Sequence, residues 1–273
     1  MAVSVERLYM TRREAARKNV FSRDRGLQIG LVVVVLAVWQ YIGMREGDFF
    51  LAPPTSVLRA FGQVIAGGEL WEAVSSTVLG IVIGFVIATV LGIVIGTAMA
   101  TSRSVATTLN PVVSAGYVIP EAALIPLMII WFGLDMTPRI ISVVLFAVFE
   151  IILSTYAGVR HVDAVLPQVA RSFGASRWQV FSRVTCVAAL PYIFSGLRMG
   201  AARAVKGMVV AELLFAATGV GGAIQDAANA YQTGKVMVYV IVITMIGVAF
   251  AGLIQLIERM WLRTWHGDEA DRT

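Results

Sequence analysis

The chain has 273 residues, of which 58% are hydrophobic and only 14% are charged, and its formal net charge is +5. Its mean hydropathy of +0.79 lies far above that of soluble domains, which excludes a soluble protein and predicts a polytopic membrane protein. The basic residues alternate with apolar runs instead of forming one basic face, so we expect no nucleic-acid partner. The single cysteine, Cys186, and two distant histidines predict neither a disulfide nor a metal centre.

Residues 1–25 form a basic arm that is followed at once by the apolar run GLQIGLVVVVLAVWQYIGM. A cleavable signal peptide has the same order of parts, but its apolar region is shorter and ends in a small-residue cleavage site. Here the apolar run continues to Trp39 and Tyr41. We therefore predict a cytoplasmic arm over residues 1–25 and a first span that is retained.

The following segment, up to residue 76, is mixed in polarity and is expected outside the membrane. Pro53 and Pro54 interrupt the chain there, and Thr55 is placed to cap a short surface helix. The second span is predicted from Thr77 to Ala100. Small residues at every fourth position place a smooth stripe on one face of this helix and predict tight packing against another helix: Gly80, Gly84, Ala88, Gly92, Gly96 and Ala100.

Four further spans are predicted from the remaining apolar runs. The third runs from about Pro111 to Leu134, and Pro120 and Pro126 predict a kinked or broken helix that faces protein or a water-filled cavity. The others are expected at 140–159, from about 190 to 217, and at 236–257. Glycines and polar residues before the last span predict an exposed loop, in which residues 224–230 could form a short helix.

The positive charges test this arrangement of six spans. The segments on one side hold fifteen Lys and Arg residues, and those on the other side hold four: Arg45, Arg59, Arg139 and Lys235. Because basic residues accumulate on the cytoplasmic side, both termini are predicted in the cytoplasm. The predicted transmembrane domain covers residues 26–262 and is followed by a cytoplasmic tail, 263–273.

The cytoplasmic loop between the fourth and fifth spans, about 160–189, is far longer than a simple connection requires. Its segment RSFGASRWQVFSRV, residues 171–184, carries three arginines among aromatic residues. Drawn as one helix, it has a polar stripe and an apolar side, with Arg177 misplaced among the apolar residues. Two interpretations stay open: an interfacial helix on the inner leaflet, or a docking helix for a soluble partner, since exposed Trp, Phe and Arg are enriched in binding hot spots.

Four stretches carry a family resemblance: PEAALIPLMIIWFG, STYAGVRHVD, GASRWQVFSRV and AALPYIFSGLRMG. With them, the chain from about Leu51 to Trp261 resembles the inner-membrane permease subunits of binding-protein-dependent ABC importers, in the sulfonate, nitrate and taurine subgroup. The family's loop signature begins with Glu-Ala-Ala, has a central glycine and ends in Ile-x-Leu-Pro. Aligned on Gly174, this chain lacks the initial Glu and has Cys186 and Val187 in place of the Leu-Pro.

The resemblance implies a coupling helix, roughly residues 170–181, that enters a groove on an ATPase subunit. A small residue at 174 would allow close approach there. The partners so implied are two cytoplasmic ATPases that bind ATP and Mg, an extracytoplasmic binding protein and a second permease copy, in the bacterial inner membrane. The docking residues would be Ala170, Phe173, Gly174, Ala175, Ser176, Arg177, Trp178 and Phe181.

The chain itself has no phosphate-binding loop, because none of its three lysines, Lys18, Lys206 and Lys235, precedes Ser or Thr. Energy must therefore come from a partner, and we expect no cofactor in this chain. Its Ser, His and Asp residues form no pattern typical of nucleophilic catalysis, so we expect a transport subunit and no enzyme.

Ionisable residues inside predicted spans are candidates for the translocation path, because they are costly in lipid: Glu121, Glu150, Lys206 and Glu212. An inward pair of Glu212 with Lys206 would explain two of them structurally, and Arg198, Arg203 and Lys206 could extend to the membrane surface. Buried carboxylates also fit an ion-coupled secondary transporter, which stays the alternative. The sequence thus predicts an all-α integral membrane fold of six transmembrane helices. The family resemblance implies a coupling helix between spans four and five and a small transported anion such as a sulfonate or nitrate.

Overall fold

A computed structural model describes residues 27–215 and 218–263, so the predicted arm 1–25 and nearly all of the predicted tail lie outside the described residues. Within these ranges the chain is helical and contains no strand, which confirms the all-α fold. The helices are an N-terminal helix Leu27–Glu46, α2 Pro54–Ala66, α3 Glu69–Thr101, α4 Arg103–Val118, the 3₁₀-helix η1 Glu121–Leu124, α5 Ile125–Phe132, α6 Met136–Arg160, α7 Val165–Ser172, α8 Arg177–Val180, the π-helix η2 Phe181–Thr185, α9 Cys186–Phe215, α10 Val220–Asn229 and α11 Thr233–Arg263.

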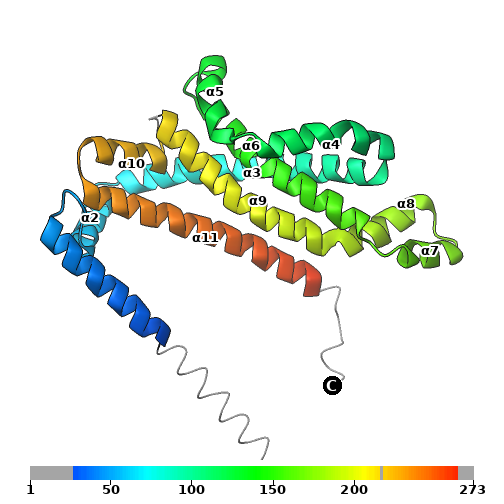
Figure 1. Cartoon of the computed structure of the whole chain (residues 1–273), viewed down its shortest axis with the longest axis horizontal. Helices are drawn as coiled ribbons and strands as arrows, with labels where there is room; N and C mark the ends of the chain where they lie inside the picture. Colours follow the sequence, from blue (N-terminus) through cyan, green and yellow to red (C-terminus); the bar gives the residue numbers. More distant parts are fainter. Residues whose placement is uncertain (1–26, 216–217, 264–273) are drawn as a thin grey trace, which may run out of the picture.

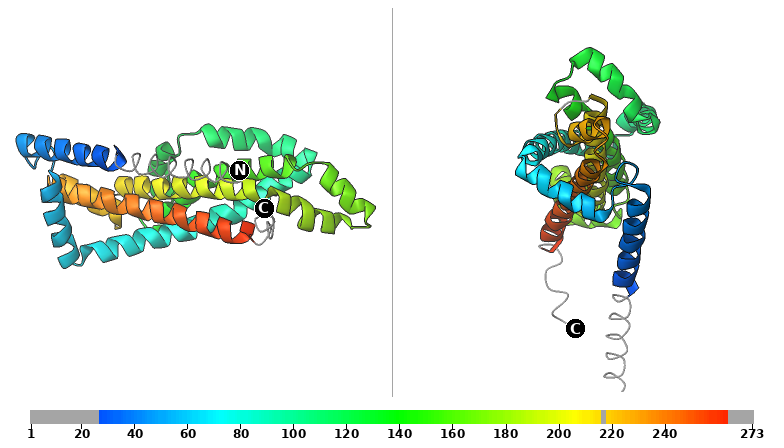
Figure 2. Two further views of the ribbon diagram at one scale, coloured as in Figure 1. Left: turned by 90° about the horizontal axis from the view of Figure 1, so that it is seen from below. Right: turned by 90° about the vertical axis from the view of Figure 1, so that its left-hand side faces the viewer.

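Five helices among the described residues are long and apolar enough to cross a membrane: the N-terminal helix, α3, α6, the helix formed by α8 to α9, and α11. A sixth crossing results if α4 and the η1–α5 pair count as one span, although an 87° bend separates them. α3, α6, α9 and α11 run side by side in an elongated bundle, whereas the N-terminal helix diverges from it (Figure 2). The spans predicted near 140–159 and 236–257 are therefore confirmed as helices, with longer bounds.

The core of the bundle consists of α3, α6 and α9 (Figure 1). Most of the stripe of small residues on α3 packs against α6, and Gly80 meets Met208 of α9, so the predicted tight helix packing is confirmed. A Cβ added at Gly84 would lie 2.6 Å from Val143, and one at Gly92 would lie 2.6 Å from Ile151. Apolar burial drives little helix association in lipid, so such close backbone contact stabilises this pair chiefly through van der Waals packing. A larger side chain on the stripe would separate α3 from α6.

The third predicted span is broken, in agreement with its prolines. α4 ends at Val118, and Pro120 cannot donate the backbone hydrogen bond that would continue the helix. Pro126 does not interrupt a helix; it lies in the first turn of α5, where the missing N–H costs nothing. The chain therefore bends sharply at η1.

Two predictions about helix ends were wrong, and one helix is longer than its predicted span. Thr55 does not cap α2: Pro53 is the N-cap and Pro54 opens the helix, which suits its fixed φ. The span predicted at 77–100 lies within α3, which begins earlier, at Glu69, with acidic residues in its first turn, where they are favourable. The loop before α11 does contain a short helix, but α10 begins at Val220, earlier than expected.

Candidate functional site

The segment 165–180, which we call the α7–α8 tip, protrudes from one end of the bundle, opposite the end that carries α2 and α10 (Figure 1). It is two short helices joined by a turn, so the single helix drawn over 171–184 was wrong. Gly174 adopts φ +80° after α7. The amide N–H of Gly174 donates to the Arg171 carbonyl at 2.9 Å, and that of Ala175 donates to the Ala170 carbonyl at 3.1 Å. This left-handed glycine cap ends α7 and reverses the chain.

A reciprocal pair of side-chain hydrogen bonds begins the second helix of the tip. The Ser176 hydroxyl accepts from the Gln179 N–H at 3.3 Å, and the Gln179 side-chain oxygen accepts from the Ser176 N–H at 2.8 Å. Such a capping box satisfies two N-terminal donors and fixes where α8 starts. From there α8 passes through η2 into α9, so that Arg177–Phe215 is one helical unit.

The tip presents aromatic side chains that nothing covers within the described chain. Phe173 is 87% exposed and Trp178 is 72% exposed. Of the other predicted docking residues, Gly174, Ser176 and Arg177 are exposed, whereas Ala170, Ala175 and Phe181 are half-buried. A larger side chain at position 174 would meet no other atom of the described chain, because the space beside Gly174 is open. Within the described chain the glycine serves a positive φ, and close approach to the groove of a partner stays a prediction.

Two predicted path residues, Glu121 and Glu150, meet at the guanidinium of Arg203 and form what we call the arginine cluster. The Arg203 Nε lies 3.1 Å from Glu150 Oε2, and its Nη1 lies 3.5 Å from Glu121 Oε1. Its Nη2 donates to the Tyr117 hydroxyl at 3.2 Å, and the guanidinium lies 5.0 Å from the Tyr117 ring centroid. Arg203 therefore pairs with α6 and η1 instead of extending to the membrane surface.

The arginine cluster lies about midway along the bundle. Glu150 follows the first residue of α6, Met136, by fourteen residues and precedes its last, Arg160, by ten, or about 15 Å at 1.5 Å per residue. The Glu150 residue is 7% exposed and the Arg203 side chain is 35% exposed. Arg203 and the two carboxylates are already paired with one another at this depth. A charged solute can therefore bind here only if it replaces one of these three groups in its ion pair.

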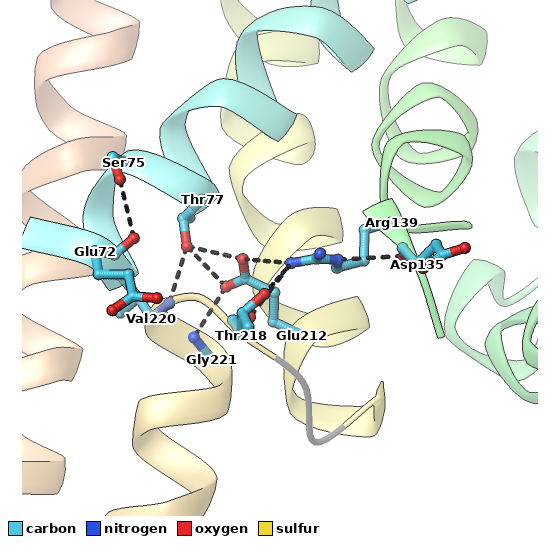
Figure 3. A network of polar contacts seen from close by, with 9 residues as sticks. All are labelled: Glu72, Ser75, Thr77, Asp135, Arg139, Glu212, Thr218, Val220 and Gly221. Atoms are coloured by element: carbon cyan, nitrogen blue, oxygen red, sulfur yellow. Dashed lines mark hydrogen bonds and ion pairs between the residues drawn. The ribbon is translucent and has the colours of Figure 1, made fainter. Parts of the chain in front are cut away.

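Glu212 is fully buried in a different group of polar residues, the Glu212 network (Figure 3). Its carboxylate accepts from the Thr77 hydroxyl at 2.8 Å and from the Gly221 N–H at 2.9 Å, and lies 3.9 Å from Arg139 Nη1. The same Arg139 nitrogen donates to the Thr218 hydroxyl at 3.1 Å. The network thus joins α3, α6 and α9 to the turn that precedes α10.

The proposed pair of Glu212 with Lys206 was wrong. Lys206 is exposed on α9 and makes no ion pair within the described residues, whereas the partner of Glu212 is Arg139. The sequence offered a signal, because residues six apart on a helix lie about 120° apart around its axis and do not lie on the same face. Arg139 and Tyr117 were missed as partners, because their contacts come from other helices.

Comparison with known proteins shows the family to which this chain is related. The profile of the family described as binding-protein-dependent transport system inner membrane component matches residues 80–263. The putative aliphatic sulfonates transport permease protein SsuC of Bacillus subtilis is 34% identical over 93% of this chain and 93% of its own length. The taurine transport system permease protein TauC of Escherichia coli is 33% identical over 90% of this chain and 92% of its own.

A solved structure shares the fold. An inward-facing conformation of the MetNI methionine ABC transporter superposes with a TM-score of 0.57, at 18% identity, over 72% of this chain and 94% of that one. At this identity the likeness concerns the overall fold alone. The chain belongs to the binding-protein-dependent transport system inner membrane components, as a permease subunit of an ABC transporter.

Proposed function

We propose that this permease imports a small sulfonate, with energy supplied by separate ATPase subunits that dock on the α7–α8 tip. The observation that carries the docking is the exposed pair Phe173 and Trp178 at the end of one continuous helical unit. The sulfonate is proposed because relatives over most of the chain are named for aliphatic sulfonates and taurine. Family membership favours this reading over the ion-coupled secondary transporter.

In the proposed topology the chain crosses the bacterial inner membrane six times, with the bent α4–α5 pair as the third crossing. The distribution of basic residues supports a cytoplasmic location for the termini and the α7–α8 tip. The membrane domain then covers 26–262, between the cytoplasmic arm 1–25 and a tail, although α11 extends to Arg263. A second copy completes the path, and the end of the bundle with α2 and α10 faces the extracytoplasmic binding protein.

Coupling is proposed to follow from the continuity of the tip with α9. Because α8 continues through the π-helix η2 into α9, a force on the tip would be transmitted to α9. α9 packs against α6 and α3, so its displacement shifts the core helices relative to each other. ATP-driven closure of two docked ATPases would then switch the paired permeases between inward-open and outward-open states.

Replacing Trp178 with alanine is expected to weaken the binding of the ATPase by at least about tenfold, because central aromatic anchors contribute about 2 kcal/mol or more. The measurement is co-purification of the ATPase with the permease, together with uptake of labelled taurine or methanesulfonate. Trp71→Ala is the matched control, since Trp71 is 79% exposed on α3, away from the tip. If the tip only rests on lipid, Trp178→Ala will leave ATPase binding unchanged.

The arginine cluster is proposed as the point in the path where an anion is recognised. One guanidinium faces two carboxylates, so the cluster repels an anion until a carboxylate withdraws. Glu121 is the one suited to do so, because it lies on the short η1 at the bend, whereas Glu150 is fixed within α6. A sulfonate would then take the place of Glu121 at Arg203.

Replacing Glu121 with glutamine is expected to lower the KM for sulfonate uptake several-fold, because the competing carboxylate is gone. Arg203→Gln is expected to reduce uptake at least about tenfold, since a charged hydrogen bond contributes about 1.5–3 kcal/mol. Arg198→Gln is the control, because Arg198 on the same helix pairs with Glu258 on α11. An unchanged KM in Glu121→Gln, or normal uptake in Arg203→Gln, would remove the cluster from the path but leave ATPase docking untouched.

A further inference from the structure

A cavity of about 820 Å³ lies where α3 ends, α4 begins and α6 ends. These three helix ends lie toward the end of the bundle that carries the α7–α8 tip (Figure 1). Arg103 from α4 and Arg160 from α6 line the cavity, together with the Tyr156 ring. The cavity belongs neither to the arginine cluster nor to the Glu212 network, whose residues do not line it.

The charge in this cavity is unbalanced. Arg160 Nη1 donates to the Tyr156 hydroxyl at 2.7 Å, and its guanidinium lies 5.5 Å from the centroid of the Tyr156 ring. This contact orients the guanidinium without neutralising it. Arg103 makes no ion pair within the described residues, and the cavity lining contains no Asp or Glu. Two cations therefore face the cavity without an anionic partner from the described chain.

The rest of the lining is divided between polar and apolar groups. Thr101, Thr107 and Asn110 add hydrogen-bonding side chains beside the arginines. Met99, Ala106 and Pro111 supply an apolar wall, contributed by the last turns of α3 and the first turns of α4. A free inorganic anion would use only the polar part, whereas an amphiphile with an anionic head would use both.

The depth of the cavity agrees with such a ligand. α3 and α6 are membrane-spanning helices of 33 and 25 residues, and the cavity is formed where they end, at Thr101 and Arg160. The uncharged stretch of α3 ends just before Arg103, and the end of such a stretch lies near the level of the lipid headgroups. In the proposed topology this is the cytoplasmic leaflet, where basic pockets between helices attract anionic headgroups.

We propose that this cavity binds the phosphate of an anionic phospholipid, with Arg103 and Arg160 holding the phosphate and the apolar wall contacting the glycerol and the first acyl carbons. The site is separate from solute transport. It would anchor the loop between α3 and α4 to the inner leaflet, next to the α7–α8 tip.

The test uses the full-length permease purified from a membrane with equal parts of phosphatidylglycerol and phosphatidylcholine, followed by mass spectrometry of the lipid retained. Wild type is expected to be enriched in phosphatidylglycerol, and the double variant Arg103→Gln/Arg160→Gln to lose most of that enrichment, about fivefold per arginine. Arg259→Gln is the matched control, because Arg259 is exposed near the end of α11 and does not line the cavity. Equal retention of both lipids by wild type would overturn the proposal.

Two further arms keep the test decisive if the double variant folds poorly. Thr107→Trp fills the cavity and leaves both arginines in place, so it too should reduce the enrichment; undiminished enrichment would count against the cavity. If millimolar inorganic phosphate removes the enrichment, the site is one for free phosphate, and the lipid proposal is wrong. Normal lipid retention with loss of ATPase binding in the double variant would instead assign the cavity to the ATPase interface.

Discussion

Replacing Gly174 with valine is expected to abolish sulfonate uptake while the transmembrane bundle still folds. Gly174 has φ +80°, a conformation that costs a residue with a Cβ about 1–2 kcal/mol and a β-branched residue more. Space is not the obstacle, because nothing lies within 4 Å of the Cβ position. The strain is relieved by opening the turn, which breaks the bonds from Gly174 to Arg171 and from Ala175 to Ala170.

Opening this turn changes the direction of α7 relative to α8, and with it the spacing of Phe173 and Trp178. An interface that depends on both aromatic side chains should then lose most of its affinity, because hot-spot contacts act as a cluster. ATPase co-purification and uptake of labelled taurine measure the effect. If Gly174→Val retains both, the docking hypothesis is wrong.

Two control variants separate a turn effect from a general loss of stability. Gly174→Asn should retain ATPase binding, since asparagine tolerates a left-handed conformation. Gly68→Val introduces the same kind of strain at φ +74°, also in open space, before α3 and away from the tip. It should lower thermal stability to a similar extent and leave ATPase binding intact.

Replacing Arg139 with methionine is expected to destabilise the permease by about 3 kcal/mol, because it leaves the buried Glu212 carboxylate without its cation. The substitution also removes the hydrogen bond from Arg139 to Thr218, in the turn before α10. This turn lies directly over the carboxylate, since a Cβ at Gly219 would overlap Glu212. Thermal unfolding of the purified complex should show a lower Tm.

The double variant Arg139→Met/Glu212→Gln distinguishes an ion pair from simple loss of packing. With the charge of Glu212 also removed, it should be more stable than Arg139→Met alone, because no uncompensated charge stays buried. Lys235→Met serves as the control, since its partner Glu69 is 58% exposed and can be hydrated. That change should cost at most about 1 kcal/mol. An equal loss of stability in the single and the double variant would contradict the ion-pair explanation.

Part of the α7–α8 tip was readable from the sequence but was overlooked. Ser176 followed three residues later by Gln179 is the pattern of a capping box, and Gly174 just before it is typical of a helix C-terminus. Together they predict two helices and a turn in place of one helix. The exposure of Phe173 and Trp178 was not readable, because it depends on which side chains other helices leave uncovered.

The sequence by itself determined the helical bundle. Apolar runs of spanning length can satisfy their backbone only as helices in lipid, the four-residue stripe of small residues on α3 requires a close neighbour, and Pro120 cannot continue α4. These features are local in the sequence, so they can be recognised without knowledge of how the rest of the chain folds.

Only the tertiary structure decided which charges meet. Arg203 with Glu150 and Arg139 with Glu212 are pairs between different helices, separated by more than fifty residues of sequence. Each pair depends on how far one helix is rotated and shifted along its neighbour, and that is set by side-chain packing across the α3, α6 and α9 core. A one-dimensional pattern shows that a buried charge needs a partner, but the packing of helices chooses it.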